Sequence, residues 1–114
     1  MKVGLVANAG PQDVDNAIAR AVRAFPDWAA TPAAERAACL DRAADLLEAE
    51  RGSLIALCIR EAGKTIPDAV SELREAVDFC RYYAARARAD FATPMSMPGP
   101  TGERNQLALH GRGV

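Results

Sequence analysis

Aromatic residues, histidine and long apolar runs are all scarce in this sequence. The only histidine is His110 and the three cysteines are scattered, so no residues have the spacing of metal ligands and no metal site is predicted. No apolar run approaches the roughly 20 residues that a membrane-spanning helix needs. The first residues, MKVGLVANAG, hold no apolar stretch of secretory-signal length. We therefore expect a soluble, cytoplasmic protein without a membrane partner.

An excess of one charge is also missing. The formal net charge is −1, and acidic and basic residues are interleaved along the chain. This distribution excludes the basic stripe of a nucleic-acid-binding protein, so no nucleic acid is expected as a partner. Three cysteines are an odd number without paired spacing, which indicates free thiols and a reducing compartment.

What the sequence does contain is alanine in helical patterns. Hydrophobic residues make up 50% of the chain, but aromatic residues only 5%. Because alanine buries little apolar area, the core is expected to be thin. We therefore expect the helices to need contacts with more sequence or with a partner, such as a second copy that associates through exposed apolar helix faces and a terminal strand.

The first half of the chain predicts an edge strand and two helices. Residues 2–6 are apolar and β-prone, which favours a short strand. Gly10-Pro11 is typical of a helix start, and Pro26 is expected to end that helix. Thr31-Pro32 starts a second helix, which is expected to reach about Arg51.

The second half predicts a short helix, a long helix and a strand. Ser53 is expected to cap the short helix and Gly63 to stop it in a left-handed conformation. The long helix covers about residues 67–91 and is followed by a proline-rich connector. Residues 106–110 favour a strand, and because a lone strand needs a sheet, we expect the chain to be incomplete at its C-terminus. The predicted fold is mainly α, with three to four helices, a short N-terminal strand and a C-terminal strand.

No complete catalytic constellation emerges from the residues alone. Cys80 falls on the apolar side of the long helix, where it is expected to be a buried small hydrophobe, and Cys39 and Cys58 have similar helical positions. His110 has no identifiable base or nucleophile beside it. The EAGK run at 61–64 has a single glycine, so it predicts a helix stop better than a phosphate loop.

Four short motifs stand in a fixed order along the chain. They are AFPDW at 24–28, PAAER at 32–36, EAGK at 61–64 and RYYA at 81–84. In order and spacing they resemble the first helices of the aldehyde dehydrogenase superfamily, whose fold is α/β. The resemblance implies that residues 1–92 are the helical N-terminal segment of the cofactor-binding domain, and that residues 93–114 are a connector and strand.

The tail PTGERNQLALHGRGV at 100–114 narrows the resemblance. It is similar to glutamate-semialdehyde (1-pyrroline-5-carboxylate) dehydrogenases, as in the dehydrogenase half of bacterial bifunctional proline-utilisation proteins. The implied reaction is the NAD-dependent oxidation of L-glutamate γ-semialdehyde to glutamate. In that family the nucleophile, the general base and the NAD-binding loops lie further along the chain. The resemblance therefore implies that these 114 residues hold no catalytic residue and bind no cofactor alone.

The same resemblance assigns a substrate-binding role to three residues of the long helix. Glu75 corresponds to the acidic position that receives the substrate's amino group, and Ser71 and Phe79 share its face. An ammonium that enters an apolar tunnel needs a charge partner. One alternative stays open for each prediction. For Glu75 it is a place on a solvated helix face without a binding role, and for the chain it is a helical interaction module without enzymatic activity.

Overall fold

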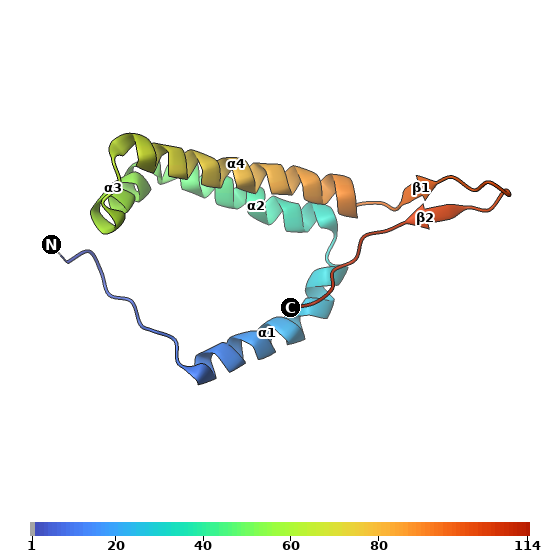
Figure 1. Cartoon of the computed structure of the whole chain (residues 1–114), viewed down its shortest axis with the longest axis horizontal. Coiled ribbons are helices and arrows are strands. Elements are labelled where there is room, and N and C mark those ends of the chain that lie inside the picture. The colour runs from blue at the N-terminus through green and yellow to red at the C-terminus, as the bar shows by residue number, and fades with distance from the viewer. Residues whose placement is uncertain (1) are drawn as a thin grey trace.

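The structure is a computed structural model that describes residues 2–114, so the first residue of the predicted 1–92 segment lies outside the described residues. Within them, four helices come first and two short strands follow (Figure 1). The elements are α1 (Pro11–Ala30), α2 (Ala33–Ala49), α3 (Arg51–Ala62), α4 (Ile66–Phe91), β1 (Met95–Met97) and β2 (Asn105–Leu107). The mainly α fold predicted from the sequence is confirmed.

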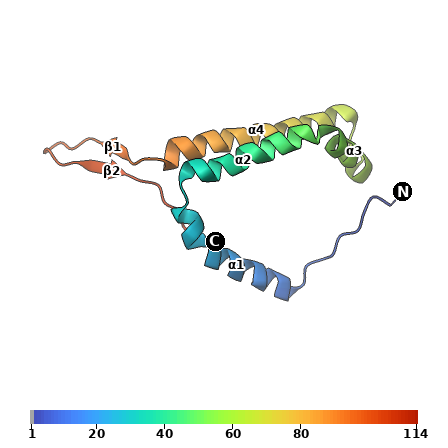
Figure 2. The same ribbon diagram turned by 180° about the vertical axis from the view of Figure 1, so that it is seen from behind.

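Helices α2 and α4 lie side by side and run in opposite directions (Figures 1 and 2). Small side chains make their contact. Two alanines of α2, Ala37 and Ala44, and two of α4, Ala69 and Ala84, are 0% exposed, and we call these four residues the alanine seam. The spacing of Ala37 and Ala44 keeps both on one side of α2. Because the seam residues carry only methyl groups, the two helix backbones can approach closely.

Ion pairs flank the alanine seam and cross from α4 to α2. Arg81 Nη2 lies 3.1 Å from Asp45 Oδ1 and 3.2 Å from Glu48 Oε2. Arg88 Nη2 lies 2.6 Å from Asp41 Oδ2. Exposed pairs of this kind add little stability. Their positions along both helices nevertheless favour one register, in which each arginine of α4 meets the carboxylates of α2.

The turn between α3 and α4 follows the signals in the sequence. Gly63 ends α3 in the left-handed region with φ of 66°, as predicted. Thr65 then caps α4, because its Oγ1 accepts a hydrogen bond from the backbone N–H of Asp68 at 3.3 Å. A stop and a cap this close together reverse the chain and bring α4 back along α2.

The junction between α2 and α3 is tighter than predicted. Helix α2 ends at Ala49 and α3 begins at Arg51, with Glu50 between them as the N-cap residue. The backbone N–H of Leu54 donates to the carbonyl of Glu50 at 3.0 Å, which closes the first turn of α3. The prediction that Ser53 caps α3 is therefore wrong, since Ser53 lies inside the helix.

Two predictions about the N-terminal part are also wrong. Residues 2–6 are not a strand, because no other strand pairs with them in the part of the chain that the structure describes. Helix α1 runs through Pro26 and ends at Ala30. Proline removes one helical hydrogen bond, to the carbonyl of Val22. Val22 is 55% exposed, so water can satisfy that carbonyl and the helix continues.

The proline-rich connector contains a β-hairpin, which the sequence did not predict. Strand β1 pairs with β2 in antiparallel register, with Met95 opposite Leu107, so the predicted strand at 106–110 is present only as β2. In the turn, the N–H of Gly102 donates to the carbonyl of Gly99 at 3.0 Å. A Cβ at Gly99 would lie 1.9 Å from a backbone oxygen, so only glycine fits there. The hairpin projects away from the helices (Figure 1).

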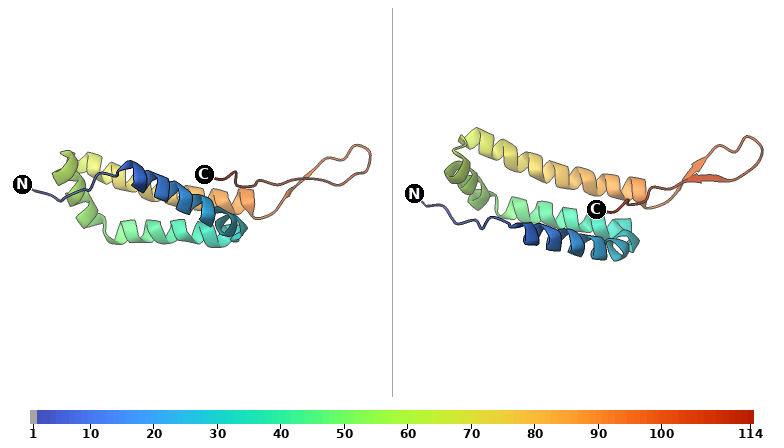
Figure 3. Two further views of the ribbon diagram at one scale, coloured as in Figure 1. Left: turned by 90° about the horizontal axis from the view of Figure 1, so that it is seen from below. Right: turned by 60° about the horizontal axis from the view of Figure 1, so that its bottom comes forward.

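Helix α1 lies apart from the pair α2 and α4 (Figures 1 and 2), and it is projected over them in the turned views of Figure 3. Within residues 2–114 it packs against no other helix, and its apolar side is open: Val14, Ile18 and Val22 are 49%, 51% and 55% exposed. Across the same residues, every helix is too short or too polar to cross a bilayer. The buried core is therefore the alanine seam and its immediate neighbours, such as Val77 at 6% exposure.

Replacing Ala84 with leucine is expected to destabilise the chain. Because Ala84 is 0% exposed against α2, the larger side chain forces the helices apart, at a cost of about 1–3 kcal/mol. Ala85→Leu is the matched control, since Ala85 is the exposed neighbour on the same helix. Urea unfolding followed by circular dichroism measures both variants. Equal free energies of unfolding for the two would contradict the packing described.

Candidate functional site

Helix α4 carries the three predicted substrate-binding residues on its outward face. Ser71, Glu75 and Phe79 follow one another at i, i+4 spacing, so they lie one above the other on successive turns. The buried residues Val77 and Ala84 face the opposite way, toward α2. All three outward residues are exposed and line one shallow hollow of about 330 Å³. The structure thus brings the predicted residues together on a single surface.

Two charged residues that sequence reasoning did not assign to the site line the same hollow. Arg74 and Asp78 stand beside Ser71, Glu75 and Phe79. Their spacing of three residues from Ser71 and Glu75 is the signal that would have found them. Among the residues that the structure describes, neither Glu75 nor Asp78 has an ion-pair partner. With two carboxylates and one guanidinium, the hollow is suited to a cation.

Aromatic rings continue the outward face toward the C-terminal end of α4. The Phe79 and Tyr83 rings are stacked, with centroids 6.0 Å apart and an angle of 28° between their planes. Tyr82 meets Tyr83 edge to face, at 5.2 Å and 79°. We call these three residues the aromatic row. Phe79 is 51% exposed, Tyr82 57% and Tyr83 56%, so the row presents apolar surface next to the charged hollow.

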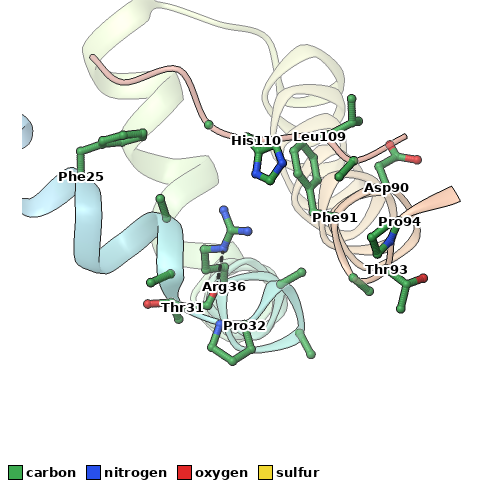
Figure 4. Close-up of a pocket in the computed structure, with 17 residues that line it drawn as sticks. Phe25, Thr31, Pro32, Arg36, Asp90, Phe91, Thr93, Pro94, Leu109 and His110 are labelled. Carbon is green, nitrogen blue, oxygen red and sulfur yellow. Dashed lines mark hydrogen bonds between the residues drawn. The ribbon is translucent and has the colours of Figure 1, made fainter. Parts of the chain in front are cut away.

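A larger hollow of about 600 Å³ lies where the end of α1, the start of α2, the end of α4 and residues 108–111 meet (Figure 4). Arg36 is at its centre. Its Nε donates to the carbonyl of Thr31 at 3.1 Å, and its guanidinium carbon lies 5.9 Å from the centre of the Phe91 ring. His110 points into the hollow beside Phe91 (Figure 4). Arg36 therefore links the α1–α2 corner to the end of α4.

This larger hollow does not assemble a catalytic set from the described residues. His110 has no hydrogen-bond partner there, and the nearby carboxylate of Asp90 is paired with Arg86 at 2.7 Å. The C-terminal segment passes close to α1: a Cβ built on Gly111 would lie 3.0 Å from the Phe25 ring. We conclude that the hollow is a junction between segments rather than a reaction site.

The three cysteines are free, and none lies beside a base. Cys58 and Cys80 are only half-buried and Cys39 is exposed, so the expectation of three buried cysteines is wrong, most clearly at Cys39. Two residues beyond the buried Ala37, the helical turn points Cys39 away from the seam. Its Sγ accepts a hydrogen bond from Arg42 Nη2 at 3.2 Å. No group of histidine, cysteine and acidic residues that could hold a metal is found within residues 2–114.

Within residues 2–114, the pKa values of two groups are shifted, and both groups lie outside the hollow of α4. The hydrogen bond to Asp45, followed by that to Glu48, raises the pKa of Arg81. In the hairpin turn, the hydrogen bond from the Thr101 hydroxyl lowers the pKa of Glu103. A carboxyl group whose pKa is lower in the folded chain than in the unfolded chain stabilises the fold at a pH above the unfolded pKa. This stabilisation is lost as the pH falls through the lowered, folded-state pKa. Neither Arg81 nor Glu103 lines the hollow that holds Glu75.

Comparisons with known proteins give one consistent picture. The model of the aldehyde dehydrogenase family matches residues 1–114. The chain is 52% identical to the bifunctional protein PutA of Escherichia coli over 99 residues, which are 86% of this chain and 8% of that protein. It is 37% identical to 1-pyrroline-5-carboxylate dehydrogenase 2 of Bacillus subtilis over 112 residues, 98% of this chain and 22% of the relative.

A solved structure agrees with the sequence relatives. The crystal structure of a D778Y mutant of PutA from Bradyrhizobium japonicum superposes with a TM-score of 0.89 at 54% identity. The match covers 95% of this chain and 11% of the PutA chain. The chain therefore spans only a small part of the length of the proteins it resembles.

Thiol labelling is expected to separate the cysteines by exposure. With a maleimide at neutral pH, Cys39 should react first and Cys58 and Cys80 more slowly, because only Cys39 is exposed. Mass spectrometry of digested samples over time identifies the labelled site, and Cys39→Ser should remove the fast phase. Labelling of Cys80 as fast as that of Cys39 would show an open thiol on α4, contrary to its half-buried position.

Proposed function

Because the chain belongs to the aldehyde dehydrogenase family, we propose that it is a helical segment of a dehydrogenase that oxidises L-glutamate γ-semialdehyde to glutamate in proline catabolism. The observation that carries the proposal is Glu75, which lies in the outward hollow of α4 and has no ion-pair partner among residues 2–114. The similarity to PutA and to 1-pyrroline-5-carboxylate dehydrogenase supports the substrate. This similarity over most of the chain favours the dehydrogenase over a stand-alone interaction module.

Glu75 would receive the ammonium group of the substrate. A cation that leaves water for an apolar site loses its hydration, at a cost of several kcal/mol, unless a carboxylate pairs with it. Phe79 offers its ring to the hydrocarbon part of the same molecule, and Ser71 adds a hydroxyl at the other side of Glu75. The role of this chain is therefore to bind and orient the substrate, while the reacting groups come from elsewhere in the enzyme.

The described residues do not fit a dinucleotide cofactor. The EAGK run at 61–64 has one glycine, and Gly63 is used to end α3. No parallel sheet with a glycine-rich loop occurs in the described part of the chain. Members of the family use NAD or NADP, and we propose NAD for the parent enzyme, bound outside this segment.

The open surfaces are proposed to be covered by two partners. The apolar side of α1 would pack on the remainder of the dehydrogenase. The part of a solved PutA that matches this chain is only 11% of PutA, so most of the protein remains to cover this surface. The hairpin would pair with a second copy, because β1 and β2 form a two-stranded sheet whose outer edges are free within residues 2–114, and Met95 and Leu107 are exposed. Three free thiols support a reducing compartment such as the cytoplasm.

The function is tested in a chimera in which the part of this chain that matches E. coli PutA over 99 residues replaces its counterpart there. We expect the chimera to reduce NAD with L-glutamate γ-semialdehyde. Glu75→Gln should raise the KM for this aldehyde about tenfold or more, since hydrogen bonds to charged groups contribute roughly 1.5–3 kcal/mol, and should leave kcat less affected. Glu61→Gln, on the exposed surface of α3, is the control. An unchanged KM in Glu75→Gln would contradict the assigned role.

The isolated chain is expected to be inactive. With NAD and L-glutamate γ-semialdehyde, NADH absorbance should stay at the level of a blank without protein, because the residues described here include no nucleophile beside a base. Light scattering should show a mass that rises with concentration as the open surfaces associate. Turnover above the blank would contradict the first expectation, and a constant monomer mass the second.

A further inference from the structure

The aromatic row reaches the charged hollow of α4 through Phe79 alone. Phe79 lines the hollow with Glu75, whereas Tyr82 and Tyr83 do not. Tyr83 stacks on Phe79 at 6.0 Å, and Tyr82 lies edge-on against Tyr83 at 5.2 Å. The chain has three phenylalanines, two tyrosines and one tryptophan, so half of its aromatic residues gather on this one face of α4.

The direction of helical side chains brings the Phe79 ring to the hollow. Side chains on an α-helix lean toward the N-terminus, so the ring of Phe79 covers the turn that carries Glu75. On an exposed face a phenylalanine would be free to change rotamer, because 51% of its surface has no neighbour. Tyr83, on the C-terminal side, restricts the ring through the stacked contact, and Tyr82 restricts Tyr83 in turn.

We propose that Tyr83, supported by Tyr82, is a positioning residue that holds the Phe79 ring against the hydrocarbon chain of the substrate. The inference rests on the proposed function, because it needs the substrate ammonium at Glu75. Through the Phe79 ring, Tyr83 would favour aldehydes whose ammonium and carbonyl groups are the right distance apart.

The dimensions of helix and substrate agree with this arrangement. Glu75 and Phe79 are four residues apart, which is about 6 Å along the helix axis. In L-glutamate γ-semialdehyde, four bonds of about 1.5 Å in a zigzag place the aldehyde carbon about 5 Å from the nitrogen. With the ammonium at Glu75 and the chain directed toward Phe79, the methylene groups pass along the ring. An aldehyde without a side chain of this length would not reach both residues.

The test uses the PutA chimera with Tyr83→Ala, Tyr83→Leu and Tyr83→Phe. Losing the stack should raise the KM for L-glutamate γ-semialdehyde about three- to tenfold in the alanine and leucine variants, as expected from the roughly 0.5–1.5 kcal/mol of an aromatic pair. kcat should stay within about twofold. Tyr83→Phe keeps the ring and should restore the KM. Propionaldehyde has no ammonium group to pair with Glu75 and is therefore not held along the Phe79 ring, so its KM should not change.

Each outcome decides the proposal. If Tyr83→Ala does not fold, as judged by circular dichroism, Tyr83→Leu decides in its place because it keeps most of the volume. An unchanged KM for the semialdehyde, or an equal loss of kcat/KM for both aldehydes, would overturn the positioning role and leave the proposed function intact. If the unaltered chimera oxidises propionaldehyde but not L-glutamate γ-semialdehyde, the proposed function fails, and this inference fails with it.

Discussion

The close contact of α2 and α4 through alanine is the constraint on which the rest of the structure depends. The four seam residues are 0% exposed. Because their methyl groups pack between the two helices, they fix the rotation of α4 about its own axis. That rotation turns Glu75 and Phe79 away from α2. The ion pairs of Arg81 with Asp45 and Glu48 lie beside the seam and favour the same register. The apolar packing thus determines which residues of α4 face away from α2.

The same constraint makes the core thin. No large side chain is fully buried among the residues that the structure describes, and the apolar side of α1 and the hairpin are open. A segment of this kind gains much of its stability from contacts outside itself. This agrees with its size relative to its relatives, of which it covers 8% to 22% in the two sequence matches described. The proposed division of labour follows: α4 supplies one wall of a site whose reacting groups are elsewhere.

The sequence predicted the features that depend on local chemistry. Gly63 as a left-handed stop and the long helix depend on nearby residues, and both are confirmed. The hairpin was missed because β1 and β2 are three residues each and their pairing is a tertiary contact. The prediction that Pro26 ends α1 fails because the carbonyl of Val22, which loses its helical hydrogen bond, is open to water. Of the aromatic row, the sequence analysis assigns only Phe79 to the site. The positions of Tyr82 and Tyr83, three and four residues further along the helix, indicate that they share its face. The roles of Ser71, Glu75 and Phe79 remain predictions.

The most direct measurement is a crystal structure of the PutA chimera with bound L-glutamate, the product, which keeps the ammonium group. The account predicts this ammonium in hydrogen-bonding contact with the Glu75 carboxylate, and the methylene groups along the Phe79 ring. Glutamate bound with its ammonium away from α4, or an α4 rotated so that Glu75 faces α2, would contradict the claim that the alanine seam orients a substrate-binding wall.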